Sequence, residues 1–271
     1  MPAAPGAGRL ALGIAYRGSA YQGWQSQLSG RTVQDRLEAA LASFADTPVG
    51  TLCAGRTDAG VHALNQVVHI DAAVERDAVS WVRGTNRYLP GDIAVQWCKP
   101  VAAAFHARNS ARGRRYVYVL LESAVRPALE SGSVGWVFRP LDGAAMRAAA
   151  AHLIGEHDFS SFRSSECQAP SPVKTMRAIA VERRGDVMGG YWRFDFDGSA
   201  FLHHMVRNIM GCLVAVGQGQ HEPTWMAEVL AAKDRDAAAP TFAADGLYFA
   251  GPYYDAAHGI PERTPAFDWL P

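Results

Sequence analysis

The residues best suited to chemistry lie in one short stretch, residues 54–63, which reads Ala-Gly-Arg-Thr-Asp-Ala-Gly-Val-His-Ala. Arg56 and Asp58 stand between two glycines and have few bulky neighbours. An apolar segment precedes the stretch, and an alternating segment at 66–71 follows it. The pattern predicts a guanidinium and a carboxylate on a tight loop at a strand end, where rigid folds often place catalytic groups. Ordinary turn formation by Asp and Gly is the competing interpretation.

A second group of residues combines aromatic rings with cations. Residues 105–108 read Phe-His-Ala-Arg, and residues 111–119 read Ala-Arg-Gly-Arg-Arg-Tyr-Val-Tyr-Val. On a strand, Tyr116 and Tyr118 would share one face. Such a mixture suits RNA, because bases stack on aromatic rings and phosphates pair with guanidinium groups. A strand with core tyrosines and exposed arginines is the plainer alternative.

A third segment, residues 201–211, reads Phe-Leu-His-His-Met-Val-Arg-Asn-Ile-Met-Gly. Its apolar residues recur at helical spacing, which predicts a core helix. Adjacent His203 and His204 would point in different directions on a helix, so they are expected to be a poor metal pair. Arg207 lies among apolar residues, and a buried guanidinium needs a partner. We therefore expect Arg207, if it is buried, to have a charged or hydrogen-bonding partner.

Taken in order, the three segments resemble the active-site motifs of the tRNA pseudouridine synthase A family, and the resemblance extends over roughly residues 9–250. It implies that Asp58 supplies the catalytic carboxylate. It also implies that Tyr116 stacks on the target uracil and could take part in proton transfer. Arg207 would pair with Asp58, because a nearby cation lowers the pKa of a carboxylate and keeps it ionised, as a nucleophile requires.

The same resemblance, together with charge, indicates which side chains contact the substrate. Family members often have an arginine between the two tyrosines, whereas this chain has Val117 there and carries its cations earlier. Arg56 would stabilise the flipped backbone or fill the vacated stack. For His62, contact with RNA and stabilisation of the turn are both open. The predicted substrate-binding residues are Tyr116, Arg56, His62, Arg108, Arg112 and Arg114.

The reaction implied by the resemblance is isomerisation of uridine to pseudouridine at positions 38, 39 and 40 of the tRNA anticodon stem-loop. A C–N glycosidic bond breaks and a C–C bond forms, so the reaction needs no cofactor and no metal. The uridine must leave the stack, and the uracil must be retained while it turns. Asp58 could attack the sugar or the base, or it could abstract a proton. The resemblance also implies a homodimer that binds tRNA across a basic cleft.

Two other classes of function stay open at this point. The first is a catalytically silent RNA-binding module, which would bind tRNA without forming product. The second is a carboxylate-dependent nucleoside or glycoside hydrolase, which would release free uracil or sugar. The presence of Asp58, Arg56, Tyr116 and Arg207 together argues against the silent module.

Composition sets broader bounds. The chain has 271 residues, 49% of them hydrophobic, which is enough for a sizeable core and excludes global disorder. Lys plus Arg equals Asp plus Glu at 26 each, yet residues 93–121 carry five cations and no acid. Four well-separated cysteines with no Cys-x-x-Cys pair argue against zinc and a disulfide framework. Because no apolar run is long enough for a signal peptide or a membrane span, we expect a cytoplasmic protein.

The elements that must position these residues follow from the apolar periodicity. A capping box at residues 32–35 predicts the start of a helix. The other predicted helices are 142–153, 201–216 and 224–232, and the predicted strands are 9–16, 49–54, 66–71, 93–99, 115–121, 175–184 and 191–197. Without strict alternation of strand and helix, this order favours an α+β fold with a largely antiparallel sheet flanked by helices. The resemblance makes it a two-lobed pseudouridine synthase fold with a cleft between the lobes.

The predicted organisation has two lobes with a short segment at each end. The predicted ranges are a flexible N-terminus at 1–8, an N-terminal lobe with the catalytic loop at 9–105, a C-terminal lobe at 106–257 and an irregular tail at 258–271.

Overall fold

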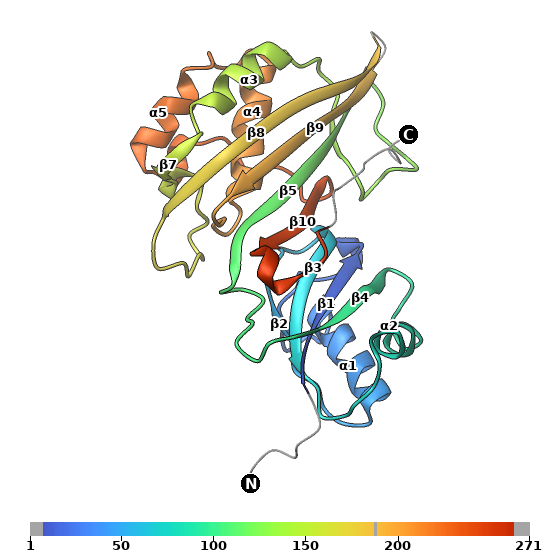
Figure 1. Cartoon of the computed structure of the whole chain (residues 1–271). Helices are drawn as coiled ribbons and strands as arrows, with labels where there is room; N and C mark the ends of the chain where they lie inside the picture. The colour runs from blue at the N-terminus through green and yellow to red at the C-terminus, as the bar shows by residue number, and fades with distance from the viewer. Residues whose placement is uncertain (1–7, 187–188, 263–271) are drawn as a thin grey trace. The chain divides into compact units, whose positions relative to one another are not determined.

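The computed structural model describes residues 8–186 and 189–262, which form two compact units. The first unit comprises residues up to 112 together with those from 249 onward, and the second comprises 113–248. Residues 1–7 and 263–271, which cover most of the predicted flexible N-terminus and irregular tail, lie outside the described residues. Ten strands and five α-helices occur in the described part of the chain (Figure 1), and the predicted α+β fold is confirmed.

The first unit is built around a mostly antiparallel group of strands in the order β4-β1-β3-β10, with β2 also paired to β3. Its strands are β1 (Arg9–Tyr16), β2 (Leu52–Cys53), β3 (His62–Asp71), β4 (Ile93–Val101) and β10 (Leu247–Tyr254). Two helices, α1 (Val33–Ala45) and α2 (Ala78–Asn86), belong to the same unit, and α2 packs on β4 and on α1 (Figure 1). The central strand β1 is antiparallel to both β3 and β4.

Strand β1 is covered on both faces. Leu12 and Ile14, two residues apart, are fully buried on one face. Ala11, on the other face, belongs to a buried cluster with Phe105 and Tyr254. This double burial explains the run of apolar residues in β1 and makes it a rigid base for the loops that leave its end.

Helix α1 begins as its sequence predicts. The side chain of Thr32 accepts a hydrogen bond from the main-chain N–H of Asp35, which caps one of the free donors of the first turn. Val33, Leu37 and Leu41 fall on one face of the helix and are fully buried. The predicted capping box is therefore confirmed, and the helix packs its apolar face into the core.

The second unit contains strands in the order β5-β9-β8-β7, with β6 parallel to β5 and the other pairings antiparallel. Its strands are β5 (Ala111–Glu122), β6 (Gly135–Val137), β7 (Gly155–Asp158), β8 (Val173–Asp186) and β9 (Gly189–Gly198). Its helices are α3 (Gly143–Ala151), α4 (Met205–Gly217) and α5 (Trp225–Ala232). Helix α3 packs on β8, α4 and α5 (Figure 1). None of the helices in the described residues is long and apolar enough to cross a membrane.

The helix predicted at 201–216 starts later than expected, at Met205. The backbone of His204 is left-handed, with a φ angle of 62°, so a helix cannot run through it. The rings of His203 and His204 therefore lie close together, with centroids 4.0 Å apart. The expectation that these two side chains point in different directions is wrong, because both residues precede the helix.

Candidate active site

The segment between β2 and β3, residues 54–61, is called the Asp58 loop below. Its first residue donates from the N–H of Ala54 to the carbonyl of Val67 at 2.8 Å, which ties the loop to β3. The N–H of Val61 donates to the carbonyl of Asp58 at 3.2 Å and closes a tight turn. Asp58 is half-buried and Arg56 is exposed. The predicted loop at a strand end is present, with the carboxylate at its centre.

The Asp58 loop is clamped by residues 17–24, called the β1 turn because they follow that strand. The N–H of Trp24 donates to the carbonyl of Thr57 at 3.0 Å, and the N–H of Gly60 donates to the carbonyl of Tyr21 at 3.4 Å. These bonds join the loop on both sides of Asp58. Because they run between main chains, these two bonds do not depend on the conformations of flexible side chains.

Two glycines allow the β1 turn to approach this closely. A Cβ atom at Gly18 would lie 1.9 Å from the carbonyl oxygen of Val61. A Cβ atom at Gly23, where φ is +87°, would lie 2.8 Å from the carbonyl oxygen of Thr57. Neither glycine is predicted from the sequence to position the Asp58 loop. Their position just after a predicted strand indicates a turn. It does not indicate what the turn contacts, because the Asp58 loop is far away in sequence.

A buried side-chain contact holds the residue before Asp58. The hydroxyl groups of Tyr16 and Thr57 lie 2.7 Å apart and form a buried hydrogen bond. The ring of Tyr16 also packs against Trp24, with centroids 5.9 Å apart, and Trp24 is almost fully buried. The backbone that carries Asp58 therefore rests on the end of β1 through apolar packing as well as hydrogen bonds.

His62 stabilises the same arrangement. It is buried, and its Nδ1 accepts a hydrogen bond of 3.0 Å from the N–H of Gly18. An Nδ1 that accepts places the proton of the neutral ring on Nε2. The observed contact corresponds to the turn-stabilising alternative, and contact of His62 with RNA stays a prediction.

Two of the predicted RNA-binding arginines lie near the same thiol in the first unit. Burial raises the pKa of Cys53 to about 11, while the positive charges of Arg56 and Arg108 act in the opposite direction. Both guanidinium groups must lie near Cys53 to have this effect. Arg56, in the Asp58 loop, and Arg108, about fifty residues further along the chain, therefore both contribute positive charge to the surroundings of Cys53.

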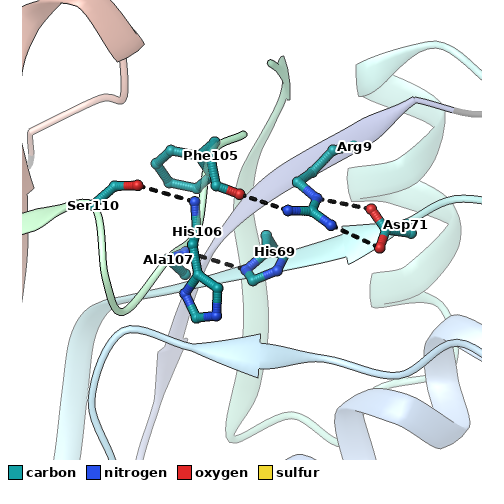
Figure 2. Close-up of polar contacts among 7 residues, drawn as sticks. All are labelled: Arg9, His69, Asp71, Phe105, His106, Ala107 and Ser110. Atoms are coloured by element: carbon teal, nitrogen blue, oxygen red, sulfur yellow. Dashed lines mark hydrogen bonds and ion pairs between the residues drawn. The ribbon is translucent and has the colours of Figure 1, made fainter. Parts of the chain in front are cut away.

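Arg108 belongs to a loop that is anchored to the sheet through its main chain (Figure 2). The N–H of Ala107 donates to Nδ1 of His69 on β3 at 3.1 Å. Arg9 donates to the carbonyl of Phe105 at 2.9 Å and to the carboxylate of Asp71 at 2.8 and 2.9 Å. The loop that presents Arg108 is thus fixed from two positions on the sheet.

The electrostatics of this anchor favour a neutral His69. Burial, followed by the charge of Arg9, lowers the pKa of His69 to about 4. The ring of His106 lies beside it, with centroids 4.8 Å apart, and its charge acts in the same direction. A neutral imidazole has a lone pair on Nδ1, which the N–H of Ala107 needs as an acceptor.

In the second unit, Tyr116 lies on β5 and is half-buried. Its ring meets that of Phe201 edge-on, with centroids 5.0 Å apart. Tyr118 is fully buried instead, and its hydroxyl donates to the carbonyl of Ala243 at 2.9 Å. Of the two tyrosines, Tyr116 is the one whose ring retains exposed surface.

Arg207 lies in the first turn of α4 and is half-buried. Its Nε donates to the carbonyl of Phe242 at 2.9 Å, and its own carbonyl accepts from the N–H of Phe242 at 3.1 Å. This two-way contact fixes the plane of the guanidinium group. Asp58 belongs to the first unit and Arg207 to the second, so the ion pair between them stays a prediction.

The remaining predicted RNA contacts have protein partners of their own. Arg112 forms an exposed ion pair with Asp255 in the first unit. Arg114 donates to the carbonyl of Ser199 at 3.1 Å in the second unit. Exposed ion pairs contribute little to stability, so Arg112 can exchange its partner at small cost.

Comparison with known proteins identifies the family. A family model described as tRNA pseudouridine synthase matches residues 13–109 and 149–255. Proteins named tRNA pseudouridine synthase A from Methylibium petroleiphilum and Polaromonas naphthalenivorans are 74% and 66% identical, each over 97% of this chain and 100% of the relative. A chain from a crystal structure of a Cbf5-Nop10-Gar1 complex is 10% identical, with a TM-score of 0.33 over 76% of this chain and 45% of that one, which is too low to support an argument. The chain belongs to the tRNA pseudouridine synthase family and is an isomerase that acts on tRNA.

Proposed function

We propose that this enzyme converts uridine to pseudouridine at positions 38, 39 and 40 of the tRNA anticodon stem-loop, and that Asp58 is its catalytic carboxylate. The observation that carries the proposal is the clamped Asp58 loop. The main chain that carries this half-buried carboxylate is held by hydrogen bonds on both sides of it, at Thr57 and at Gly60. Preorganisation of this kind is what a nucleophile or general base requires.

The proposed division of roles uses both units. Asp58 reacts with the flipped uridine, at the sugar or at the base or by abstracting a proton. Arg207 keeps the carboxylate ionised and oriented, because a guanidinium favours the charged form of a nearby acid. Tyr116 stacks on the uracil and keeps it in place while it turns. No group donor, redox agent or metal enters this chemistry.

The RNA is proposed to meet a basic surface. Arg56 and Arg108, which both act on Cys53, would contact the backbone near the target nucleotide. The predicted roles of His62, Arg112 and Arg114 in substrate binding belong to the same proposal.

We also propose that the enzyme acts as a homodimer in the cytoplasm. Light scattering of the purified protein tests the homodimer, and cell fractionation tests the location.

The experiment that tests this function is mapping of the modified positions. Transcripts of tRNA that carry uridine at 38, 39 and 40 are treated with wild type or with Asp58→Asn, then derivatised with carbodiimide and read by primer extension. The proposal predicts stops at these three positions with the wild type and none with Asp58→Asn. Stops elsewhere would contradict the proposed sites, free uracil would favour a hydrolase, and tight binding without product would favour a silent RNA-binding module.

A further inference from the structure

A cavity of about 540 Å³ opens in the first unit beside the β1 turn. Three segments of the chain form its wall: the β1 turn at Tyr21, the residues around the start of α1 at Arg31 and Arg36, and the connection between α2 and β4 at Tyr88. We call it the Arg31–Arg36 cavity. None of the catalytic or RNA-binding residues named above lines it.

The two arginines of this cavity carry charge that the protein does not neutralise. Both side chains are exposed. Within residues 8–186 and 189–262, neither guanidinium group forms a hydrogen bond or an ion pair. Many arginines elsewhere in the chain have such partners, for example Arg9 with Asp71. Two uncompensated guanidinium groups on one concave surface are suited to an anion.

Two carboxylates that adjoin residues of the cavity, Asp92 through Tyr21 and Asp35 next to Arg36, are occupied by other donors. Asp92 accepts a hydrogen bond of 2.6 Å from the hydroxyl of Tyr21. Burial, followed by this hydrogen bond, raises the pKa of Tyr21, so the hydroxyl stays protonated and remains a donor to Asp92. Asp35 accepts from the hydroxyl groups of Ser26 and Thr32 at 2.5 Å each. These contacts explain why neither acid forms an ion pair with Arg31 or Arg36.

The cavity is tied to the Asp58 loop by main-chain hydrogen bonds. The carbonyl of Arg31 accepts from the N–H of Gln22 at 2.9 Å. The next residue back, Tyr21, accepts from the N–H of Gly60, two residues after Asp58. The main chain at Arg31 is therefore joined to the Asp58 loop through the β1 turn, so a ligand bound by Arg31 would lie on the same hydrogen-bonded framework as the proposed catalytic carboxylate.

Tyr88 adds an aromatic surface at the edge of this cavity. Its side chain is about half exposed, at 51%, where the chain passes from α2 to β4. Large aromatic side chains are usually more buried than this. An aromatic ring beside two cations is the combination that single-stranded nucleic acid recognises, through base stacking and phosphate contacts.

We propose that the Arg31–Arg36 cavity binds a phosphodiester of the tRNA strand near the flipped uridine, and that Tyr88 stacks on a nearby base. This proposal rests on the proposed function of Asp58, because it assigns the RNA path that leads to that residue. The two guanidinium groups would bind the phosphate oxygens, and the main chain of the β1 turn would set the register between this phosphate and the target nucleotide.

The test compares Arg31→Gln/Arg36→Gln with Arg83→Gln. Arg83 is an exposed arginine on α2 that does not line the cavity, so its variant matches the loss of a surface charge in the same unit. Binding of full-length tRNA is measured by fluorescence anisotropy in the Asp58→Ala background at several salt concentrations. Turnover is measured in the same variants with Asp58 intact.

The proposal predicts that the double variant binds tRNA about 10-fold to 100-fold more weakly at 0.1 M salt. The slope of log Kd against log salt should fall by roughly 0.7 to 0.9, because the contact with one phosphodiester is lost. KM should rise more than kcat falls. Tyr88→Leu should weaken binding about 10-fold, whereas Tyr88→Phe should bind like the wild type, because it keeps the ring. Arg83→Gln should match the wild type in every measurement.

Equal salt slopes for the wild type and the double variant, in an enzyme that forms pseudouridine, would overturn the cavity proposal alone. A wild type that forms no pseudouridine would overturn the proposed function as well. Circular dichroism checks that each variant is folded, which is expected because the substituted side chains are exposed.

Discussion

At the scale of single residues, the position of Asp58 depends on neighbours that carry no charge. Thr57 is held through its hydroxyl by Tyr16 and through its carbonyl by Trp24. Nδ1 of His62 accepts a hydrogen bond from the N–H of Gly18. These contacts are buried, so removing one partner leaves a polar group without water and costs more than the bond itself contributes.

The hydrogen bond between Tyr16 and Thr57 can be tested by a double-mutant cycle. Tyr16→Phe and Thr57→Val should each lower the free energy of unfolding by about 1–3 kcal/mol, because each removes the buried hydrogen bond between the two hydroxyl groups. The double variant should lose less than the sum of the two, by about 1 kcal/mol. Urea denaturation measures all three, and strict additivity would show that the two hydroxyl groups do not depend on each other.

His69 should make stability depend on pH. Its pKa is about 4 in the folded protein and about 6.5 in the unfolded chain, so the unfolded state binds the proton more readily. The neutral form of His69 therefore stabilises the folded state fully above pH 6.5. About 2 kcal/mol of the free energy of unfolding is lost as the pH falls toward 4. Urea denaturation between pH 4 and pH 7 measures it.

The matched control for this residue is His69→Asn. Its side-chain oxygen can still accept from the N–H of Ala107 but does not titrate in this range, so this part of the pH dependence should disappear. His69→Leu removes the acceptor and should be less stable by about 1–3 kcal/mol at pH 7. The same pH dependence in His69→Asn and wild type would show that other groups cause it.

At the scale of elements, local signals were sufficient for β1 and α1. The alternation of large apolar residues with smaller ones in β1 and the capping box of α1 can both be read from adjacent residues. Helix α2 was not predicted, because its nine residues include Gly84, a poor helix former whose role is to let Phe44 pack closely. Strand β10 was not predicted either, because Gly251 and Pro252 resemble a turn. In both cases packing against distant residues overrides the local pattern.

In the candidate site, too, contacts between residues that are distant in sequence could not be predicted. The sequence placed Asp58 and Arg56 on a loop at a strand end, since glycines and a neighbouring strand mark such a loop. The contact between the β1 turn and the Asp58 loop could not be predicted from the sequence. Gly18 and Val61 are far apart in sequence, and they meet only when β1 and β3 pair. The anchor between His69 and Ala107 is hidden for the same reason.

The β1 turn itself can be tested at Gly18. Gly18→Ala would bring a Cβ atom within 1.9 Å of the carbonyl oxygen of Val61, so the main chains must separate. We expect the free energy of unfolding to fall by about 1–3 kcal/mol and turnover to fall about 100-fold, because a small displacement of a catalytic group is costly. Thermal denaturation and tRNA turnover measure the two effects.

Gly91→Ala is the control for this substitution. Gly91 belongs to the same unit and is exposed, and nothing lies within 4 Å of the Cβ position. This variant should change stability by less than about 0.5 kcal/mol and leave turnover unchanged. If Gly18→Ala behaves like Gly91→Ala, the clamp does not position Asp58.

At the scale of the whole molecule, the proposed chemistry is divided between two compact units. The first holds Asp58 with the main chains that fix it, and the second holds Tyr116 and Arg207. The tail of the chain returns to the first unit through β10, so the two units are interleaved in sequence. A catalytic set that draws on both units requires both to be folded.

Substitution of Arg207 tests this division. Arg207→Gln should lower single-turnover rates about 100-fold or more, because the substitution removes the proposed charged partner of the Asp58 carboxylate. Arg207→Lys keeps the charge without the planar fork and should recover only part of the rate. Rapid mixing with excess enzyme measures both, and wild-type rates in Arg207→Gln would remove Arg207 from catalysis.

The most direct test of the central claim is tritium release from tRNA transcripts labelled at C5 of uridine, because conversion to pseudouridine displaces that hydrogen. Wild type is compared with Asp58→Ala and Asp58→Asn at equal, saturating tRNA. The account predicts release by the wild type and at least about a 1,000-fold slower rate in both variants. Release at similar rates by all three would contradict it and place the catalytic centre away from the Asp58 loop.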